Sequence, residues 1–94
     1  MKKATARHIL VNSKEVCQEL KNEIENGKDF AEIAKEMSEC PSGQKGGSLG
    51  EFVPGQMVES FDKVVFSAEV DKVYGPVKTQ FGFHLIEVTS LTED

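Results

Sequence analysis

The sequence predicts an α+β domain in which three helices pack around a small sheet. Two observations predict this fold class. Segments with strand composition and segments with helical periodicity follow one another in the order β-α-α-β-α-β-β. The last two strands, at 77–79 and 82–89, are joined by Gln80-Phe81, which is the spacing of a hairpin. Without an internal repeat or linker, we expect one domain over residues 1–94.

The first strand is expected at 5–11, where Thr-Ala-Arg-His-Ile-Leu-Val has the composition of a strand. A helix near 13–26 follows it. Asn12 is the expected N-cap, and Glu15 would complete a capping box. Apolar residues then recur on one face until Gly27 ends the helix; they are Val16, Leu20 and Ile24.

A second capping arrangement, formed by Asp29 and Glu32, predicts another helix that ends close to Ser38. Its apolar face is spaced at i, i+3, i+4 and i+7 and consists of Phe30, Ile33, Ala34 and Met37. The segment 40–50 holds four of the eight glycines and one of the three prolines. We therefore expect a long loop there, without regular structure.

Glycine and proline separate short elements in the second half of the chain. A strand at 50–53 is expected to turn at Pro54-Gly55. A helix from about 58 to 66 follows, and its inward face is predicted to be Phe61, Val64 and Val65. Tyr74-Gly75-Pro76 is expected to break the chain before the closing hairpin.

The composition is that of an ordinary globular domain, with 38% apolar and 29% charged residues. The net charge is −5 and the basic residues are scattered, which argues against nucleic acid as a partner. No apolar run approaches the roughly 20 residues that span a bilayer, and nothing after Met1-Lys2-Lys3 directs export. We expect a cytoplasmic monomer without a membrane partner. Cys17 and Cys40 are expected to be reduced thiols.

His8 and His84 are the only two histidines, and each lies near the middle of a predicted strand. Strand alternation places each of them on an apolar face, with the neighbours Ala6 and Leu10, and Ile86 and Val88. A single histidine in such a place is ordinarily a core imidazole with a satisfied hydrogen bond. Two at matching positions favour a shared site, although the sequence alone does not make the strands adjacent.

The polar residues could serve three other chemistries. The loop lacks a phosphate-binding pattern, because Lys45 is followed by Gly46-Gly47-Ser48 and a strand instead of a helix. Cys40, His8 and His84 could ligate zinc, but they lack the paired spacings of structural zinc sites. A Cys–His nucleophilic enzyme is the third alternative and stays open at this point.

A set of motifs distributed in order along nearly the whole chain resembles the parvulin peptidyl-prolyl cis/trans isomerases. The motifs are His-Ile-Leu-Val at 8–11, Phe-Ala-Glu-Ile-Ala-Lys-Glu-Met-Ser at 30–38, Gly-Gly-Ser-Leu-Gly at 46–50, Phe61 with Phe66, Gly75-Pro76-Val77, and Phe-Gly-Phe-His-Leu-Ile at 81–86. The short single-domain bacterial parvulins are the most similar. The resemblance implies a four-stranded antiparallel sheet surrounded by helices, with the two histidine strands side by side at its centre.

The resemblance also implies the site. Its expected members are His8 and His84 as a buried hydrogen-bonded pair, Cys40 and Thr79 in the polar network beside it, Met57 and Phe61 as the proline pocket, and Leu49, Gln56 and Phe81 around the groove. For Met57 and Phe61 the alternative is core packing. A His–His hydrogen bond needs a donor and an acceptor, so at least one imidazole must be neutral. Rotation about the X-Pro peptide bond breaks no covalent bond, so we expect no cofactor or metal. Cys40 is expected to tune the charge and hydrogen bonding around His8 and His84.

The expected substrates are proline-containing peptides and unfolded protein segments. The phosphate-selective branch of the family has a long basic segment after the first strand, whereas here Asn12 and Ser13 alone precede the helix. We therefore expect phosphate-independent activity and a preference for apolar residues before proline. The alternative is a non-catalytic, chaperone-like module that binds unfolded or proline-containing segments.

Overall fold

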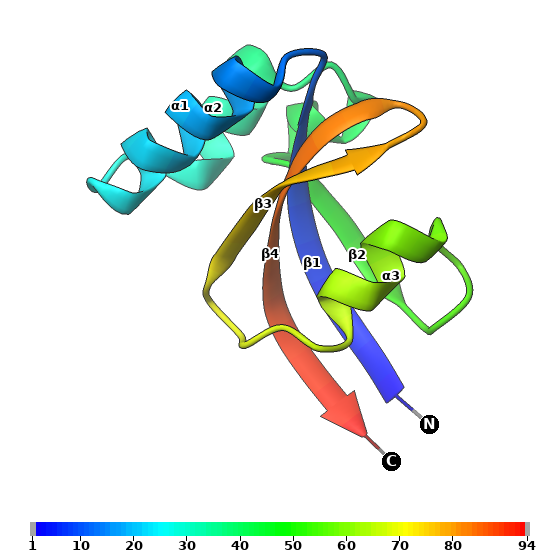
Figure 1. Ribbon diagram of the computed structural model, residues 1–94. Helices are drawn as coiled ribbons and strands as arrows, with labels where there is room; N and C mark the ends of the chain where they lie inside the picture. The colour runs from blue at the N-terminus through cyan, green and yellow to red at the C-terminus, as the bar shows by residue number, and fades with distance from the viewer. Residues whose placement is uncertain (1, 94) are drawn as a thin grey trace.

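The strands of the computed structural model form one antiparallel sheet in the order β2-β1-β4-β3 (Figure 1). They are β1 (Lys2–Val11), β2 (Ser48–Phe52), β3 (Val73–Thr79) and β4 (Gly82–Glu93). The structure describes residues 2–93; Met1 and Asp94, the ends of the predicted domain, lie outside the described residues. The two histidine strands, β1 and β4, are neighbours at the centre of the sheet. The predicted fold class and element order are confirmed.

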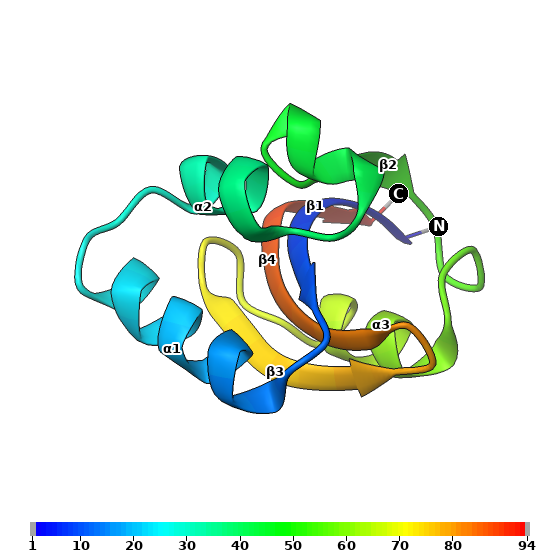
Figure 2. The ribbon, with the colours of Figure 1, turned by 90° about the horizontal axis from the view of Figure 1, so that it is seen from above.

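Helices cover both faces of this sheet. They are α1 (Lys14–Glu25), α2 (Phe30–Met37) and α3 (Glu59–Val65), with a short 3-10 helix, η1, at Pro41–Lys45. Figures 1 and 2 show α1 and α2 on one side of the sheet and α3 on the other. Within residues 2–93, no helix combines the length and the apolar character needed to cross a bilayer.

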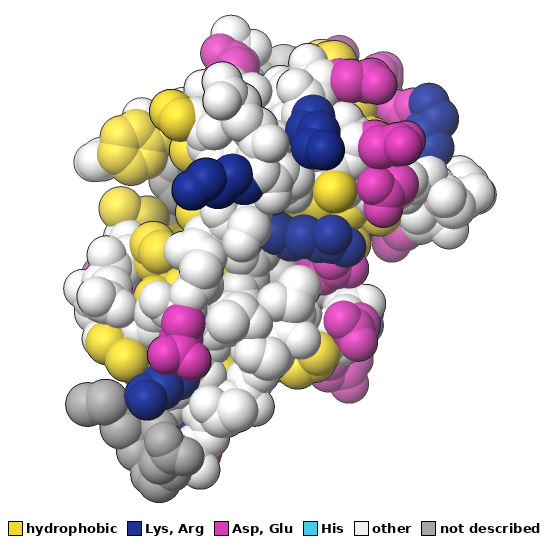
Figure 3. All heavy atoms as spheres, turned by 180° about the vertical axis from the view of Figure 1, so that it is seen from behind, with side chains coloured by type: hydrophobic (Ala, Val, Ile, Leu, Met, Phe, Trp, Pro, Cys, Tyr) yellow, Lys and Arg dark blue, Asp and Glu magenta, His cyan; other side chains and the backbone are white. Residues whose placement is uncertain are grey.

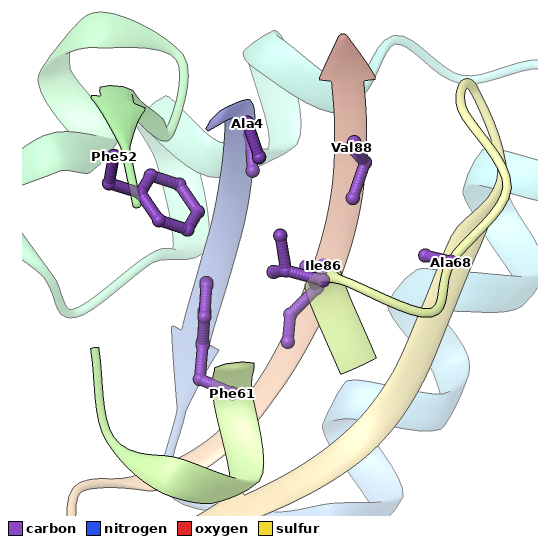
Figure 4. Packing of buried hydrophobic residues seen from close by; sticks show 8 residues of the cluster. Ala4, Phe52, Phe61, Ala68, Ile86 and Val88 are labelled. Carbon is purple, nitrogen blue, oxygen red and sulfur yellow. The ribbon is translucent and has the colours of Figure 1, made fainter. Parts of the chain in front are cut away.

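The two faces bury separate cores, because successive residues of a strand point to opposite sides. Leu85 belongs to the core under α1 and α2, and its neighbour Ile86 belongs to the core under α3. Figure 4 shows Phe52 of β2 and Phe61 of α3 directed toward Ile86. With apolar contacts on both faces, the central strands are held rigidly, which fixes the positions of the two histidines.

The central strands are longer than predicted. Pairing between β1 and β4 continues from Val11 opposite Phe83 to Lys2 opposite Glu93, whereas 5–11 and 82–89 were expected. Apart from the buried Ala4, the added residues are mostly polar and partly or fully exposed, so no apolar alternation marks them as strand.

Two expected breaks in regular structure are wrong. β3 begins at Val73 and continues through Gly75-Pro76. Its pairing with β4 shifts register between Tyr74 and Val77, and this irregularity accommodates the dipeptide within the strand. The 40–50 loop contains η1 and the start of β2. Pro41 fits the first turn of η1, and Gly46 closes it in the left-handed conformation with φ +70°.

The helix ends follow the predicted logic with one correction. Ser13, not Asn12, caps α1, because the Ser13 hydroxyl accepts a hydrogen bond from the Val16 N–H at 3.3 Å. Asp29 caps α2 as predicted by accepting from the Glu32 N–H at 3.2 Å.

Candidate active site

The two histidines form a buried pair on the face of the sheet that α3 covers. His8 lies opposite Ile86 in the register, and His84 lies opposite Leu10, so the imidazoles are diagonal neighbours. Their Nδ1 atoms are 2.9 Å apart, and the residues are 5% and 4% exposed. The hydrogen-bonded pair implied by the family resemblance is therefore present in the structure.

Hydroxyl groups extend the pair in both directions. On one side, His8 Nε2 lies 3.1 Å from Ser42 Oγ, and the Ser42 hydroxyl donates to Cys40 Sγ at 3.3 Å. On the other side, His84 Nε2 lies 2.7 Å from Thr79 Oγ1. Cys40 thus belongs to the polar network, as expected, but it reaches the histidines through Ser42.

With both imidazoles uncharged, hydrogen-bond counting gives the direction of this network. The single proton of the Ser42 hydroxyl points at Cys40, so its oxygen accepts from His8 Nε2–H. His8 Nδ1 then accepts from His84 Nδ1–H, and His84 Nε2 accepts from the Thr79 hydroxyl. Each ring then carries one proton, which is the state that burial of the two rings favours.

The environment of the rings favours the same protonation state. Burial lowers the pKa of His8 to about 4, with a smaller contribution from His84. Burial also lowers the pKa of His84. A charged imidazole would be poorly solvated here, because α3 and the sheet exclude water.

The segment between α2 and β2 forms hydrogen bonds with the backbone of β1 next to His8. His8 N–H donates to Gly47 O at 3.0 Å, Leu10 N–H donates to Ser38 Oγ at 3.0 Å, and Glu39 N–H donates to Leu10 O at 2.7 Å. These bonds continue the edge of β1 beyond the part that β2 pairs, which ends at Arg7 opposite Ser48. The loop therefore completes the backbone pairing of the histidine strand.

An apolar groove of about 360 Å³ lies over the histidine pair. Its lining consists of His8, Leu10, Glu39, Cys40, Pro41, Leu49, Met57, Val58, Phe61, Phe81 and His84. The Phe61 ring meets both imidazoles edge-on, with centroids 5.8 Å apart and interplanar angles of 81° and 85°. In Figure 3, apolar side chains gather along the left edge, which is the side where Figure 1 draws α3 and the β3–β4 turn.

Most of the predicted site residues meet at this groove. Those in its lining are His8, Cys40, Leu49, Met57, Phe61, Phe81 and His84. Thr79 lies behind the groove, where its oxygen bonds His84 and also accepts from the Phe81 N–H at 3.1 Å. Phe81 is 62% exposed, which places it at the rim.

Gln56 departs from the prediction. Its side chain is exposed and does not line the groove; its Oε1 accepts from the Val53 N–H at 2.8 Å. The amide therefore closes the turn at Pro54-Gly55, and this local backbone partner holds it away from the groove.

Five residues of the site were missed by sequence reasoning. They are Leu10, Glu39, Pro41 and Val58 in the lining, and Ser42 in the polar network. Leu10 could have been found, because it shares a strand face with His8. The other residues reach the site through the path of the loop and the start of α3, which no local pattern specifies.

The fold and the groove define a parvulin-type domain, and comparison with known proteins gives the family. The model of the PPIC-type PPIase (rotamase) domain matches residues 3–90. The chain therefore belongs to the PPIC-type peptidyl-prolyl cis/trans isomerase family, and it is an isomerase domain.

Relatives and solved structures agree with this assignment. The chain is 42% identical over 92 residues to "Foldase protein PrsA" of Geobacillus sp. (strain WCH70), covering 97% of this chain and 33% of the relative. The crystal structure of peptidylprolyl isomerase (PrsA) from Bacillus anthracis superposes with a TM-score of 0.95 at 31% identity, covering 98% of this chain and 43% of that one. The chain spans about a third of the length of the curated relatives it matches.

A small parvulin matches over nearly its whole length. The solution structure of NmPin, the parvuline of Nitrosopumilus maritimus, gives a TM-score of 0.85 at 33% identity. The match covers 96% of this chain and 98% of that one. The sheet and helices described above are thus sufficient for a parvulin fold.

Proposed function

We propose that the domain accelerates X-Pro bond rotation without forming a covalent intermediate, with the proline held between Met57 and Phe61. The observation that carries this proposal is the position of these two side chains in an apolar groove directly over a neutral histidine pair. Rotation about the peptide bond is opposed by a barrier of about 18–20 kcal/mol that arises from amide resonance. Catalysis requires only that the groove bind the twisted amide more tightly than either planar form.

The apolar lining supplies one part of this preference. The twisted amide has less charge separation than the planar one, so removal of water favours it. Gripping the pyrrolidine ring also holds one side of the bond while the preceding carbonyl turns. Each 1.4 kcal/mol of differential binding corresponds to about tenfold in rate.

The polar network serves as scaffold and fixed electrostatics in this mechanism. Its hydrogen bonds run in one direction from Thr79 to Cys40, which holds each ring in one tautomer. The Cys40 thiol accepts a hydrogen bond from Ser42 and is separated from His8 by that hydroxyl. This separation favours the non-covalent role over a Cys–His nucleophile, which needs its base adjacent to the thiol.

We further propose that the natural substrates are proline-containing peptides and unfolded protein segments with an apolar residue before proline. The mainly apolar lining supports this preference. The foldase names of the longer relatives support a role on unfolded chains. A chaperone-like module without turnover is the alternative, and a cytoplasmic location and a monomeric state stay predictions.

A protease-coupled assay with Leu-Pro peptides tests the function directly. We expect turnover by the unchanged domain and a loss of at least about tenfold in kcat/KM for Phe61→Ala. Phe61 is 3% exposed, so the substitution also removes core packing worth about 3–5 kcal/mol. Met57→Ala, at a less buried position, is the matched variant. The backbone amide NMR spectra of both variants must show that they are folded like the parent domain. Turnover by folded Phe61→Ala and Met57→Ala at the parent rate would contradict the pocket.

A further inference from the structure

The groove lining contains one acidic side chain and no basic one apart from the two histidines. Among its lining residues within 2–93, Glu39 is the only carboxylate and no lysine or arginine is present. The two histidines at its base are only 5% and 4% exposed, and burial disfavours their charged form. The charge that a bound peptide meets in the groove is therefore negative and comes from one residue.

Backbone contacts fix Glu39 at the mouth of the groove. Its N–H donates to Leu10 O at 2.7 Å, and the next N–H, that of Cys40, donates to Ser38 Oγ at 3.4 Å. Leu10 is two residues from His8 on the same strand face. Glu39 is thus anchored to the strand that carries the catalytic network.

The Glu39 side chain has no cation of its own. It is exposed, and none of the ion pairs found among residues 2–93 includes it; those pairs are Arg7–Glu87, Lys28–Glu23, Lys63–Glu59 and Lys72–Glu69. Lys35 lines an adjoining cavity together with Glu39 but forms no ion pair with it, and the groove itself contains no lysine or arginine. A cationic group of a bound peptide would therefore find an available carboxylate next to the apolar surface that holds the proline.

We propose that Glu39 is a specificity-determining residue that selects substrates with lysine or arginine flanking the X-Pro pair and disfavours substrates with an acidic residue there. This inference rests on the proposed function and deepens it. The apolar groove holds the X-Pro pair, and Glu39 recognises the charge next to it. Because the carboxylate is exposed, its effect should be about two- to fivefold per charge step.

The test uses a hexapeptide host with Leu-Pro at its centre and exchange NMR spectroscopy, which measures isomerisation without a protease. Lysine, glutamine or glutamate is placed either directly before the leucine or directly after the proline. At low salt, kcat/KM should fall in the order lysine, glutamine, glutamate at one or both positions. The order should weaken at high salt, because the interaction is exposed.

Substitutions at Glu39 separate its local effect from that of the net charge. Glu39→Gln should make the three peptides nearly equal, and Glu39→Lys should reverse their order. Glu36→Gln is the matched control, because it removes the same charge from an exposed position on α2 that lies outside the groove. This variant should keep the parent's order.

The outcomes distinguish the inference from the function beneath it. If all peptides turn over but lysine has no advantage, or if Glu39→Gln keeps the order, the inference is overturned and the isomerase stands. If Glu36→Gln removes the order as fully as Glu39→Gln does, the discrimination belongs to the overall charge and the inference is likewise overturned. Absence of turnover for every peptide would overturn the proposed function and the inference with it.

Discussion

At the scale of residues, the site is governed by the cost of placing charge in a buried space. His8 and His84 satisfy each other because one donates where the other accepts, and the hydroxyls of Ser42 and Thr79 complete the two ends. An extra proton on either ring would remove an acceptor and place a charge under α3. The pair is therefore tied to the stability of the fold as well as to the shape of the groove.

This arrangement makes stability depend on pH. The folded-state pKa of His8 is about 4, below the ordinary value of 6.5, so the unfolded chain takes up the proton first as the pH falls. The contribution of neutral His8 to the free energy of unfolding is fully present above about pH 6.5 and is lost progressively as the pH falls toward about 4. We expect His8 alone to lower the free energy of unfolding by about 2 kcal/mol between pH 7 and pH 5.

Urea unfolding at both pH values measures this effect. The control is His8→Gln, which has no imidazole and should lose less stability over the same interval. The carboxylates are common to both proteins, so their contribution cancels in this comparison. Equal pH dependence in the two proteins would show that His8 is not kept neutral by the fold.

The role of Cys40 is also decided at the scale of single groups. Cys40→Asp retains a hydrogen-bond acceptor for the Ser42 hydroxyl, whereas Cys40→Ala leaves that hydroxyl without its partner. We expect the aspartate variant to keep substantial kcat/KM and the alanine variant to lose more. If both folded variants are inactive and an acyl-enzyme is trapped by mass spectrometry of the parent protein, catalysis is covalent.

At the scale of elements, the segment between α2 and β2 is the part whose shape the site depends on most. Gly47 has a φ of +88°, and a Cβ there would lie 2.3 Å from His8 O. The same residue accepts the His8 N–H through its own carbonyl. The close approach that needs a glycine is therefore the contact that positions the histidine strand.

Substitution of this glycine should affect both stability and catalysis. Gly47→Ala introduces strain from the positive φ and a clash with the backbone of β1, so we expect a loss of at least about 2–3 kcal/mol and a lower kcat/KM. Gly55→Ala is the matched control, because its φ is +93° but no atom lies within 4 Å of the added Cβ. Equal costs for the two variants in thermal unfolding would show that the contact with His8 is unimportant.

The elements also show what the sequence could predict. The helices and the middle of each central strand were found because their apolar residues keep a helical or alternating period. The ends of β1 and β4 were missed because backbone pairing continues where the side chains are polar, as at Lys2 and Glu93. In the site, strand alternation singled out the two histidines, and the family resemblance implied their pairing and assigned Met57 and Phe61 to the groove. Ser42 and Glu39 could not be predicted from local patterns, because the loop brings them there.

At the scale of the whole molecule, acidic side chains and apolar side chains gather at different parts of the face drawn in Figure 3. Figure 3 shows acidic side chains at the upper right, on the α1 and α2 side, and apolar side chains along the left edge. The net charge of −5 acts on any peptide that approaches, and Glu39 adds a local negative charge at the groove. Anionic substrates are therefore opposed both during approach and when bound.

The arginine content leads to the same expectation for phosphorylated substrates. Arg7 is the only arginine of the chain, and its Nε lies 2.5 Å from Glu87 Oε1. Its guanidinium carbon also lies 4.7 Å from the centroid of the Phe30 ring in α2, so it occupies the face opposite the histidines. The strongest phosphate-binding side chain is thus engaged elsewhere.

We therefore expect a Leu-Pro peptide to exceed the matched phosphoserine-Pro peptide in kcat/KM by at least about tenfold. A phosphoserine carries a charge of about −1.5 to −2 near neutral pH, and the apolar lining offers it no compensating donor. A Glu-Pro peptide, with a single charge, should fall between the two. Exchange NMR at low and high salt measures all three peptides, and salt should narrow the difference by screening the repulsion. A phosphoserine peptide that turns over faster than the leucine peptide would require a phosphate site that this groove does not provide.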